Sequence, residues 1–66
     1  MQTGSIKTWN SQKGFGFIET DDDELFVNIN DLHPSFSGKQ PIEGQRVKFD
    51  VRSDMKGDRA VNVRPA

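Results

Sequence analysis

Residues 46–52 read RVKFDVR, and apolar and charged side chains alternate throughout this stretch. A period of two predicts a β-strand with one face buried and the other in water. Residues 60–64, AVNVR, begin the same pattern again. The polar segment 53–58 between them contains a glycine, which is typical of a hairpin connection. These residues therefore predict two adjacent antiparallel strands.

The pattern extends to three further strands toward the N-terminus. Residues 25–29, LFVNI, alternate in the same way, and residues 5–11 and 13–20 supply the other two strands. The acidic run 21–24 predicts a turn, because four consecutive acids cannot form a buried strand. Residues 30–44 hold two prolines and two glycines and form the one long connection.

Five short strands joined by polar turns predict an all-β fold in which one antiparallel sheet closes into a small barrel. Closure removes the exposed edges that a flat sheet of this size does not protect. We expect residues 1–66 to form a single domain. The side chains expected inside the barrel are Ile6, Ile18, Leu25, Val27, Leu32, Val47, Phe49, Val51, Val61 and Val63.

The composition excludes several classes of protein. Five Phe and one Trp in 66 residues are too many for a disordered tail. The sequence has no cysteine, which excludes disulfides and thiolate metal sites and suits the reducing cytoplasm. No apolar segment approaches the roughly 20 residues of a membrane span. The net charge of −1 argues weakly against nucleic acid, so any such binding depends on local placement of charge.

The segment KGFGFI, residues 13–18, carries the clearest functional signal. Alternation puts Phe15 and Phe17 on one face, so they point outward if Ile18 points into the core. Outward rings beside Lys13 are typical of a platform on which flat rings stack, with a cation placed for a phosphate. The alternative is that both rings belong to the core and the glycines only bend the strand.

Phe26 favours the platform over the core. The aliphatic residues of 25–29 claim the inner face of their strand, which sends Phe26 outward. Pairing this strand with the Phe15 and Phe17 strand gathers three rings on one surface, and Trp9 is expected to extend the patch at its edge. An exposed aromatic cluster on a small protein marks a binding site.

Four segments together resemble the bacterial cold-shock domain: residues 4–18 (GSIKTWNSQKGFGFI), 25–29 (LFVNI), 43–49 (EGQRVKF) and 60–63 (AVNV). KGFGFI matches the first ribonucleoprotein motif of that family, and LFVNI stands in the place of the second. The resemblance implies a five-stranded antiparallel OB-fold barrel that binds single-stranded RNA and DNA and acts as an RNA chaperone. The residues expected to bind nucleic acid are Lys7, Trp9, Asn10, Lys13, Phe15, Phe17, Phe26, Asn28, Phe36, Lys39 and Lys56.

The chain departs from the family pattern at several of these positions. The family usually has Lys-Trp-Phe-Asn where residues 7–10 read KTWN, so Thr8 stands at the exposed tryptophan position. The second motif commonly ends Phe-Val-His-Phe, whereas residues 26–29 read FVNI, and Asn28 still offers hydrogen bonds to a base edge. Phe36 is the expected stand-in for an aromatic of the long loop. We therefore expect weaker binding than in a typical member.

No pattern in the sequence indicates catalysis, a metal site or a cofactor. His33 is expected to be a solvated or locally hydrogen-bonded loop residue, and the acidic run 21–24 lacks the ligand spacing of a calcium loop. The expected partner is single-stranded RNA or DNA, bound by a cytoplasmic monomer. The alternative is an OB-fold interaction module that docks a protein partner through the same aromatic patch.

Overall fold

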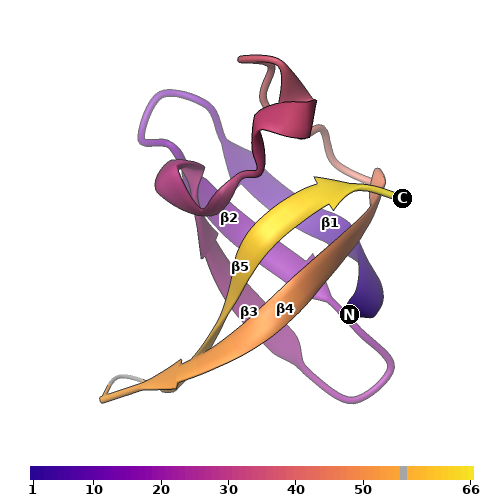
Figure 1. Cartoon of the computed structure of the whole chain (residues 1–66), viewed down its shortest axis with the longest axis vertical. Helices are drawn as coiled ribbons and strands as arrows, with labels where there is room; N and C mark the ends of the chain where they lie inside the picture. Colours follow the sequence, from indigo (N-terminus) through magenta and orange to yellow (C-terminus); the bar gives the residue numbers. More distant parts are fainter. Residues whose placement is uncertain (56) are drawn as a thin grey trace.

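The computed structural model describes residues 1–55 and 57–66, with the side chain of Asp54 left out. The strands form a closed barrel in the order β1-β2-β3-β5-β4 (Figure 1). An all-β barrel consistent with an OB-fold is confirmed. The strands are β1 (Gln2–Asn10), β2 (Phe15–Glu19), β3 (Glu24–Asn28), β4 (Arg46–Asp54) and β5 (Gly57–Pro65).

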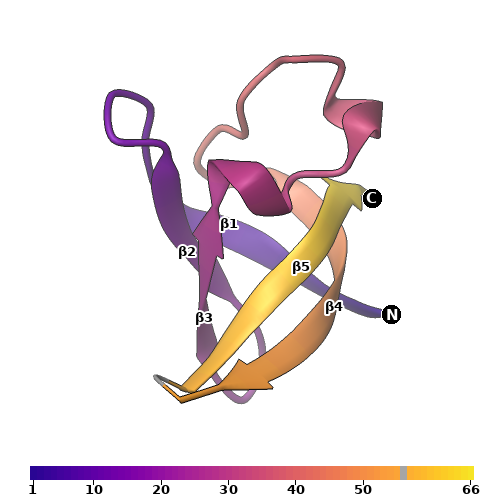
Figure 2. The same ribbon diagram turned by 60° about the vertical axis from the view of Figure 1, so that its left-hand side comes forward.

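One neighbouring pair of strands is parallel, which differs from the expected all-antiparallel sheet. β3 and β5 run in the same direction where they meet, with Phe26 opposite Arg59. A closed ring of five strands cannot alternate in direction all the way round, so one pair has to be parallel. Figure 1 and Figure 2 both show β5 crossing beside β3 at this junction. The parallel contact therefore closes the barrel.

The core consists of apolar side chains from all five strands and from the long connection. Most of the expected interior residues are buried, and Leu32 packs against them from the rim. Phe36 and Ala60 also belong to the core, although the strand alternation did not place them there. The buried residues are Ile6, Ile18, Leu25, Val27, Phe36, Val47, Phe49, Ala60 and Val63.

Two valines expected inside the barrel lie elsewhere. Val61 is opposite Asp50 on the outer side and is only half-buried, because β5 contains a bulge at Asn62. Asn62 has a left-handed φ of 52°, which lets an extra residue enter the strand and reverses which residues face inward. Val51 pairs with Ala60 but is 37% exposed. The β4–β5 hairpin extends beyond the rest of the barrel, so side chains near its tip have less core to contact (Figure 1).

The long connection contains two short 3₁₀ helices, η1 (Ile29–Asp31) and η2 (Pro34–Phe36). Asn28 caps η1 by accepting a hydrogen bond from the backbone N–H of Asn30, which ends β3 one residue before the expected boundary. His33 caps η2, and its Nδ1 accepts the backbone N–H of Ser35 at 3.0 Å. The expected local role of His33 in the loop agrees with this contact.

Candidate nucleic-acid interface

Three phenylalanine rings lie together on the outer side of β2 and β3. Phe17 is directly opposite Phe26 in the strand register, and Phe15 is opposite Asn28. The ring centroids of Phe15 and Phe26 are 5.8 Å apart, and those of Phe17 and Phe26 are 6.0 Å apart. Phe17 is 37% exposed, and the other two rings are half-buried. We call these three residues the ring face.

The inner side of β2 explains why the rings point outward. Ile18 is fully buried, and Gly16 occupies the other inward position of the strand. A Cβ atom on Gly16 would come within 2.2 Å of the carbonyl oxygen of Thr8 and 2.7 Å of the Trp9 ring. The glycine is therefore required by close approach of β1. The alternative in which Phe15 and Phe17 fill the core is wrong.

Trp9 lies on the opposite side of the sheet from the ring face, so it does not extend it. A bulge between Ile6 and Thr8 shifts the register of β1, after which Thr8 is opposite Phe17 and Trp9 is opposite Gly16. The indole packs against the core over Gly16, and its Nε1 donates to Gln40 Oε1 at 2.7 Å. The outward position next to Phe17 therefore belongs to Thr8.

Asn10 organises the turn between β1 and β2. Its Oδ1 accepts the backbone N–H groups of Gln12 and Lys13, at 3.1 Å and 3.0 Å, and its carbonyl oxygen accepts from Gly14 N at 2.8 Å. These bonds hold the turn that carries the exposed Lys13 at the end of the ring face. The side-chain oxygen of Asn10 is thus occupied by the turn, which gives this residue a positioning role.

The Asn28 side chain is next to the ring face and is also partly committed to the fold. Its Oδ1 accepts the backbone N–H of Asn30, while its own backbone N–H donates to Asp31 Oδ2 at 3.3 Å. The bond to Asp31 is one half of a capping box at the start of η1, in which the Asn28 side chain also accepts from the backbone N–H of Asp31. The amide nitrogen of Asn28 is the donor that this arrangement does not use.

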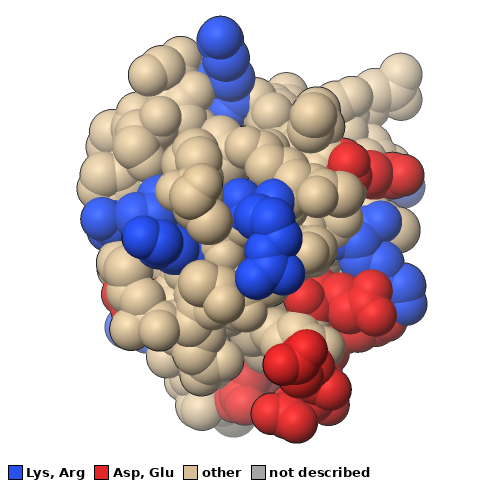
Figure 3. All heavy atoms as spheres, turned by 90° about the vertical axis from the view of Figure 1, so that its right-hand side faces the viewer, with Lys and Arg blue, Asp and Glu red and all other residues tan. Residues whose placement is uncertain are grey.

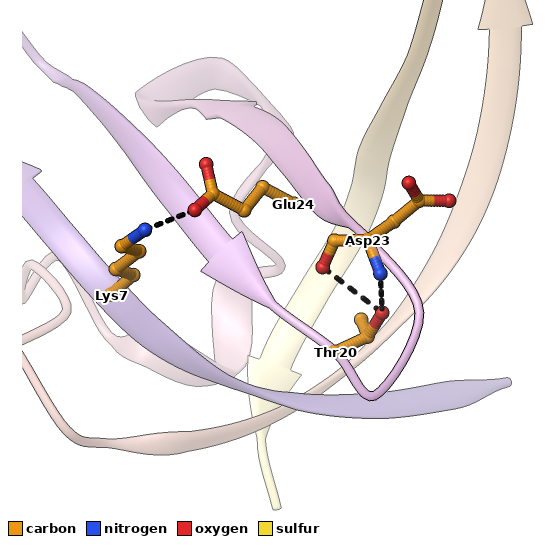
Figure 4. A network of polar contacts seen from close by, with 4 residues as sticks. All are labelled: Lys7, Thr20, Asp23 and Glu24. Atoms are coloured by element: carbon orange, nitrogen blue, oxygen red, sulfur yellow. Dashed lines mark hydrogen bonds and ion pairs between the residues drawn. The ribbon is translucent and has the colours of Figure 1, made fainter.

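Lys7 forms an ion pair with Glu24 that crosses β2. Figure 4 shows the Lys7 ammonium meeting the Glu24 carboxylate, next to the turn in which the Thr20 hydroxyl bonds the backbone of Asp23. The hydrogen bond from Lys7 to Glu24, together with the attraction of that carboxylate, raises the pKa of Lys7 above its usual 10.5. Both side chains are about half exposed, at 47% and 48%, so a phosphate has to compete with Glu24 for this lysine.

The remaining expected residues are Phe36, Lys39 and Lys56. Phe36 is only 6% exposed and belongs to the core, so its ring has no free face for a base and the expected stand-in role is corrected. It is buried because η2 packs against β5 and adds this ring to the core. Lys39 is exposed, and its backbone N–H donates to the carbonyl oxygen of Phe36 at 2.9 Å. Lys56 lies outside the residues that the structure describes.

Two features of the chain connect the structure to a known family. The chain forms a closed five-stranded barrel with outward rings, and the family described as the 'Cold-shock' DNA-binding domain matches residues 2–66. The chain belongs to the cold-shock domain family. Membership of this family implies that the cold-shock domain binds nucleic acid and has a chaperone-like role in general.

Similar proteins cover nearly the whole cold-shock domain. It is 42% identical over 67 residues to the cold shock protein CspC of Bacillus subtilis, with 100% of both chains covered. It is 44% identical over 63 residues to the cold shock protein CspV of Vibrio cholerae, covering 92% of this chain and 89% of the relative. It is 39% identical over 64 residues to the major cold shock protein of Streptococcus pyogenes, covering 96% and 94%.

We find neither a candidate metal site nor a membrane-spanning helix in the described part of this cold-shock domain. Among residues 1–55 and 57–66, no three His, Cys, Asp or Glu side chains are grouped so that they could hold a metal ion. No helix in the same residues has the length and apolar character needed to cross a membrane.

The sequence patterns do not predict one residue that lies beside the ring face. Arg59 of β5 is opposite Phe26 across the parallel junction, so it continues the row of outward positions from β3 onto β5. Nothing in the local alternation of β5 indicates that it neighbours β3. Only the closed order of the strands brings these two residues together, and this order is a non-local property of the fold.

Proposed function

We propose that the ring face of this cold-shock domain binds single-stranded RNA or DNA by stacking bases on Phe15, Phe17 and Phe26. The observation that supports it is the grouping of three outward rings, with centroids 5.8 Å and 6.0 Å from the central one. Base–aromatic stacking contributes about 1–3 kcal/mol per base and tolerates any sequence. Thr8 occupies the outward place beside Phe17 without a ring, which favours weaker binding than in a member with a fuller aromatic set.

The charged groups around the rings support contacts to the sugar–phosphate backbone. Lys13 is exposed on the adjoining turn, and Lys7 becomes available when Glu24 releases it. Lys39 and Lys56 are retained in the proposed set, whereas Trp9 and Phe36 are removed from it. Few phosphate contacts of this kind predict a mild salt dependence, with a slope of about −0.7 per phosphate for single strands.

The consequence of such binding is an RNA chaperone activity that requires no catalytic step. A protein that binds unpaired strands and leaves duplexes unbound shifts weak secondary structure toward the open form by mass action. We infer that residues 1–66 do this as one domain and as a monomer, in the reducing cytoplasm that the absence of cysteine suits.

The test replaces Phe17, the most exposed of the three rings, with alanine. We expect Phe17→Ala to weaken binding of a dye-labelled oligo-dT or oligo-U hexamer by about 5–150-fold, which corresponds to the loss of one stacked base. Fluorescence anisotropy measures the Kd, and chemical denaturation measures stability. Stability should fall by only about 1 kcal/mol, the value of one edge-to-face ring contact.

Val51→Ala is the matched control, because Val51 is as exposed as Phe17 but lies outside the ring face. It should leave the hexamer Kd unchanged. Failure of the wild-type protein to bind either hexamer would exclude the proposal and favour the docking of a protein partner on the rings. A stability loss above about 3 kcal/mol for Phe17→Ala would show that this ring acts as core.

A further inference from the structure

All four arginines of the chain lie on β4 and β5. Phe49 and Val63 are buried, so the charged residues that alternate with them face outward. The register pairs Arg52 with Arg59 and Lys48 with Arg64, while Arg46 begins β4. The outer side of this strand pair therefore presents cations in facing pairs.

The charges of the molecule are segregated although they nearly cancel in sum. Ten acids oppose nine basic residues, but four of the acids are consecutive at residues 21–24, in the turn after β2 and at the first residue of β3. Figure 3 shows most of the Lys and Arg side chains in view across the middle of one side of the molecule, with most of the Asp and Glu toward its lower right and others at the right-hand edge. A local surface can thus attract phosphates in a protein of net charge −1.

The row of outward residues runs without a break from the ring face onto β4. Phe17 is opposite Phe26, Phe26 is opposite Arg59, and Arg59 is opposite Arg52. Adjacent strands are about 4.8 Å apart, so Arg52 is about 10 Å from Phe26 along this row. A strand whose bases stack on the rings therefore reaches both arginines by continuing in one direction across the barrel wall.

Arg59 is held in place by a contact from the long connection. Its Nη2 is 3.6 Å from Asp31 Oδ1, and the other oxygen of that carboxylate accepts the backbone N–H of Asn28. Asp31 is largely buried, whereas the Arg59 side chain is 36% exposed. The carboxylate thus holds the guanidinium near η1 while leaving part of it open to a ligand.

The acids of β4 and β5 that the structure describes are bonded to neutral side chains. Asp50 accepts from Asn62 Nδ2 at 3.4 Å, and Asp58 accepts from the Ser53 hydroxyl at 2.7 Å. Arg52 lies between these two sites on an exposed part of β4. The planar guanidinium of Arg52 carries several N–H donors and can bond two oxygens of one phosphate at the same time.

We propose that Arg59 and Arg52 form a second contact surface for nucleic acid, which binds the phosphates of a single strand after it leaves the ring face over Phe26. The proposal rests on the proposed function of the ring face and extends it to longer ligands. It assigns a length dependence to binding: a hexamer has few nucleotides left beyond the rings, and a longer strand contacts both arginines more fully.

The test measures the Kd of an oligo-dT hexamer and an oligo-dT dodecamer over a series of salt concentrations. The wild-type protein should bind the dodecamer more tightly and with a steeper salt dependence than the hexamer. Arg52→Gln should lower the dodecamer slope by about 0.7, the value of one phosphate contact, and should weaken hexamer binding less than dodecamer binding. Arg52→Lys keeps the charge and should retain most of that slope.

Arg46→Gln is the matched control, since it removes the same charge from the other end of β4, where Arg46 Nη1 contacts the Ser5 hydroxyl. It should leave both ligands unaffected. Equal effects of Arg46→Gln and Arg52→Gln, or an unchanged dodecamer slope in Arg52→Gln, would overturn the arginine surface and leave the ring face intact. A wild-type protein that binds neither ligand would overturn both proposals.

Discussion

The outer side of β2 and β3 and the outer side of β4 and β5 are built from opposite chemistry on one barrel. The first presents three rings with an ion pair and an acidic turn at its end. The second presents two facing pairs of cations, Arg52 with Arg59 and Lys48 with Arg64. Rings supply binding energy that salt hardly changes, whereas guanidinium groups supply energy that falls as salt rises. Salt dependence therefore distinguishes which face a ligand uses.

The largest expected effect comes from Gly16, which lies on the inner side of β2 beneath the ring face. Gly16→Ala places a Cβ within 2.2 Å of a backbone oxygen of β1, which cannot move without shifting the strand. We expect a stability loss of about 3 kcal/mol or more, enough to unfold much of a domain this small. Chemical denaturation measures it, with Thr8→Ala on the outer side of β1 as the control. A stable Gly16→Ala protein would contradict the close packing of β1 on β2.

A smaller effect is expected from enlarging the ring face. Thr8 is exposed and opposite Phe17, so Thr8→Trp should add one stacking partner beside the existing rings. Hexamer affinity should rise by about 5–150-fold with no change in the salt slope, because the added group is uncharged. Thr8→Val, which adds no ring, is the control. An unchanged Kd would mean that the bound strand does not pass over this part of β1.

The smallest expected effect comes from the ion pair that crosses β2. Glu24→Gln frees Lys7 for a phosphate and removes one negative charge from the end of the ring face. The hexamer should bind a few-fold more tightly at low salt, and the salt slope should steepen by about 0.7. Asp22→Asn, which removes a charge from the neighbouring turn, is the control. A slope identical to that of the wild type would show that Lys7 does not contact the ligand.

The same pair has a defined dependence on pH. The pKa of Lys7 is raised in the folded protein, so its contribution to stability is fully present up to about pH 10.5 and is lost as the pH rises through the folded-state value. Wild type and Glu24→Gln should therefore converge in stability at alkaline pH when unfolding by urea is compared. A difference that persists unchanged at high pH would contradict a role of the Lys7 charge.

Local pattern predicted the strands and the ring face because both depend on neighbours in sequence. Alternation assigns Phe15, Phe17 and Phe26 to the outside once Ile18 is placed inside, and the structure agrees. The positions of the bulges in β1 and β5 could not be predicted in this way. The register shift after Ile6 and the left-handed residue Asn62 depend on the partner strand, which a single stretch of sequence does not identify.

Contacts between distant segments account for the other misplaced residues. Phe36 closes the barrel opening because η2 folds over β5, and no periodicity in a loop predicts that position. Trp9 lies away from the ring face because the bulge in β1 places it opposite Gly16, and the position of that bulge depends on the partner strand. Arg59 was missed because its neighbour Phe26 is on a strand far away in sequence, joined only by the parallel closure.

The partial burial of Trp9 has a practical consequence. The only indole of the chain packs against the core, and its Nε1 donates to Gln40 of the long connection, 31 positions away in sequence. Its emission therefore reports whether the connection is seated on the barrel, and detachment of that segment should redden the spectrum before the strands separate. Trp9 fluorescence can thus be used to follow the long connection separately from the strands.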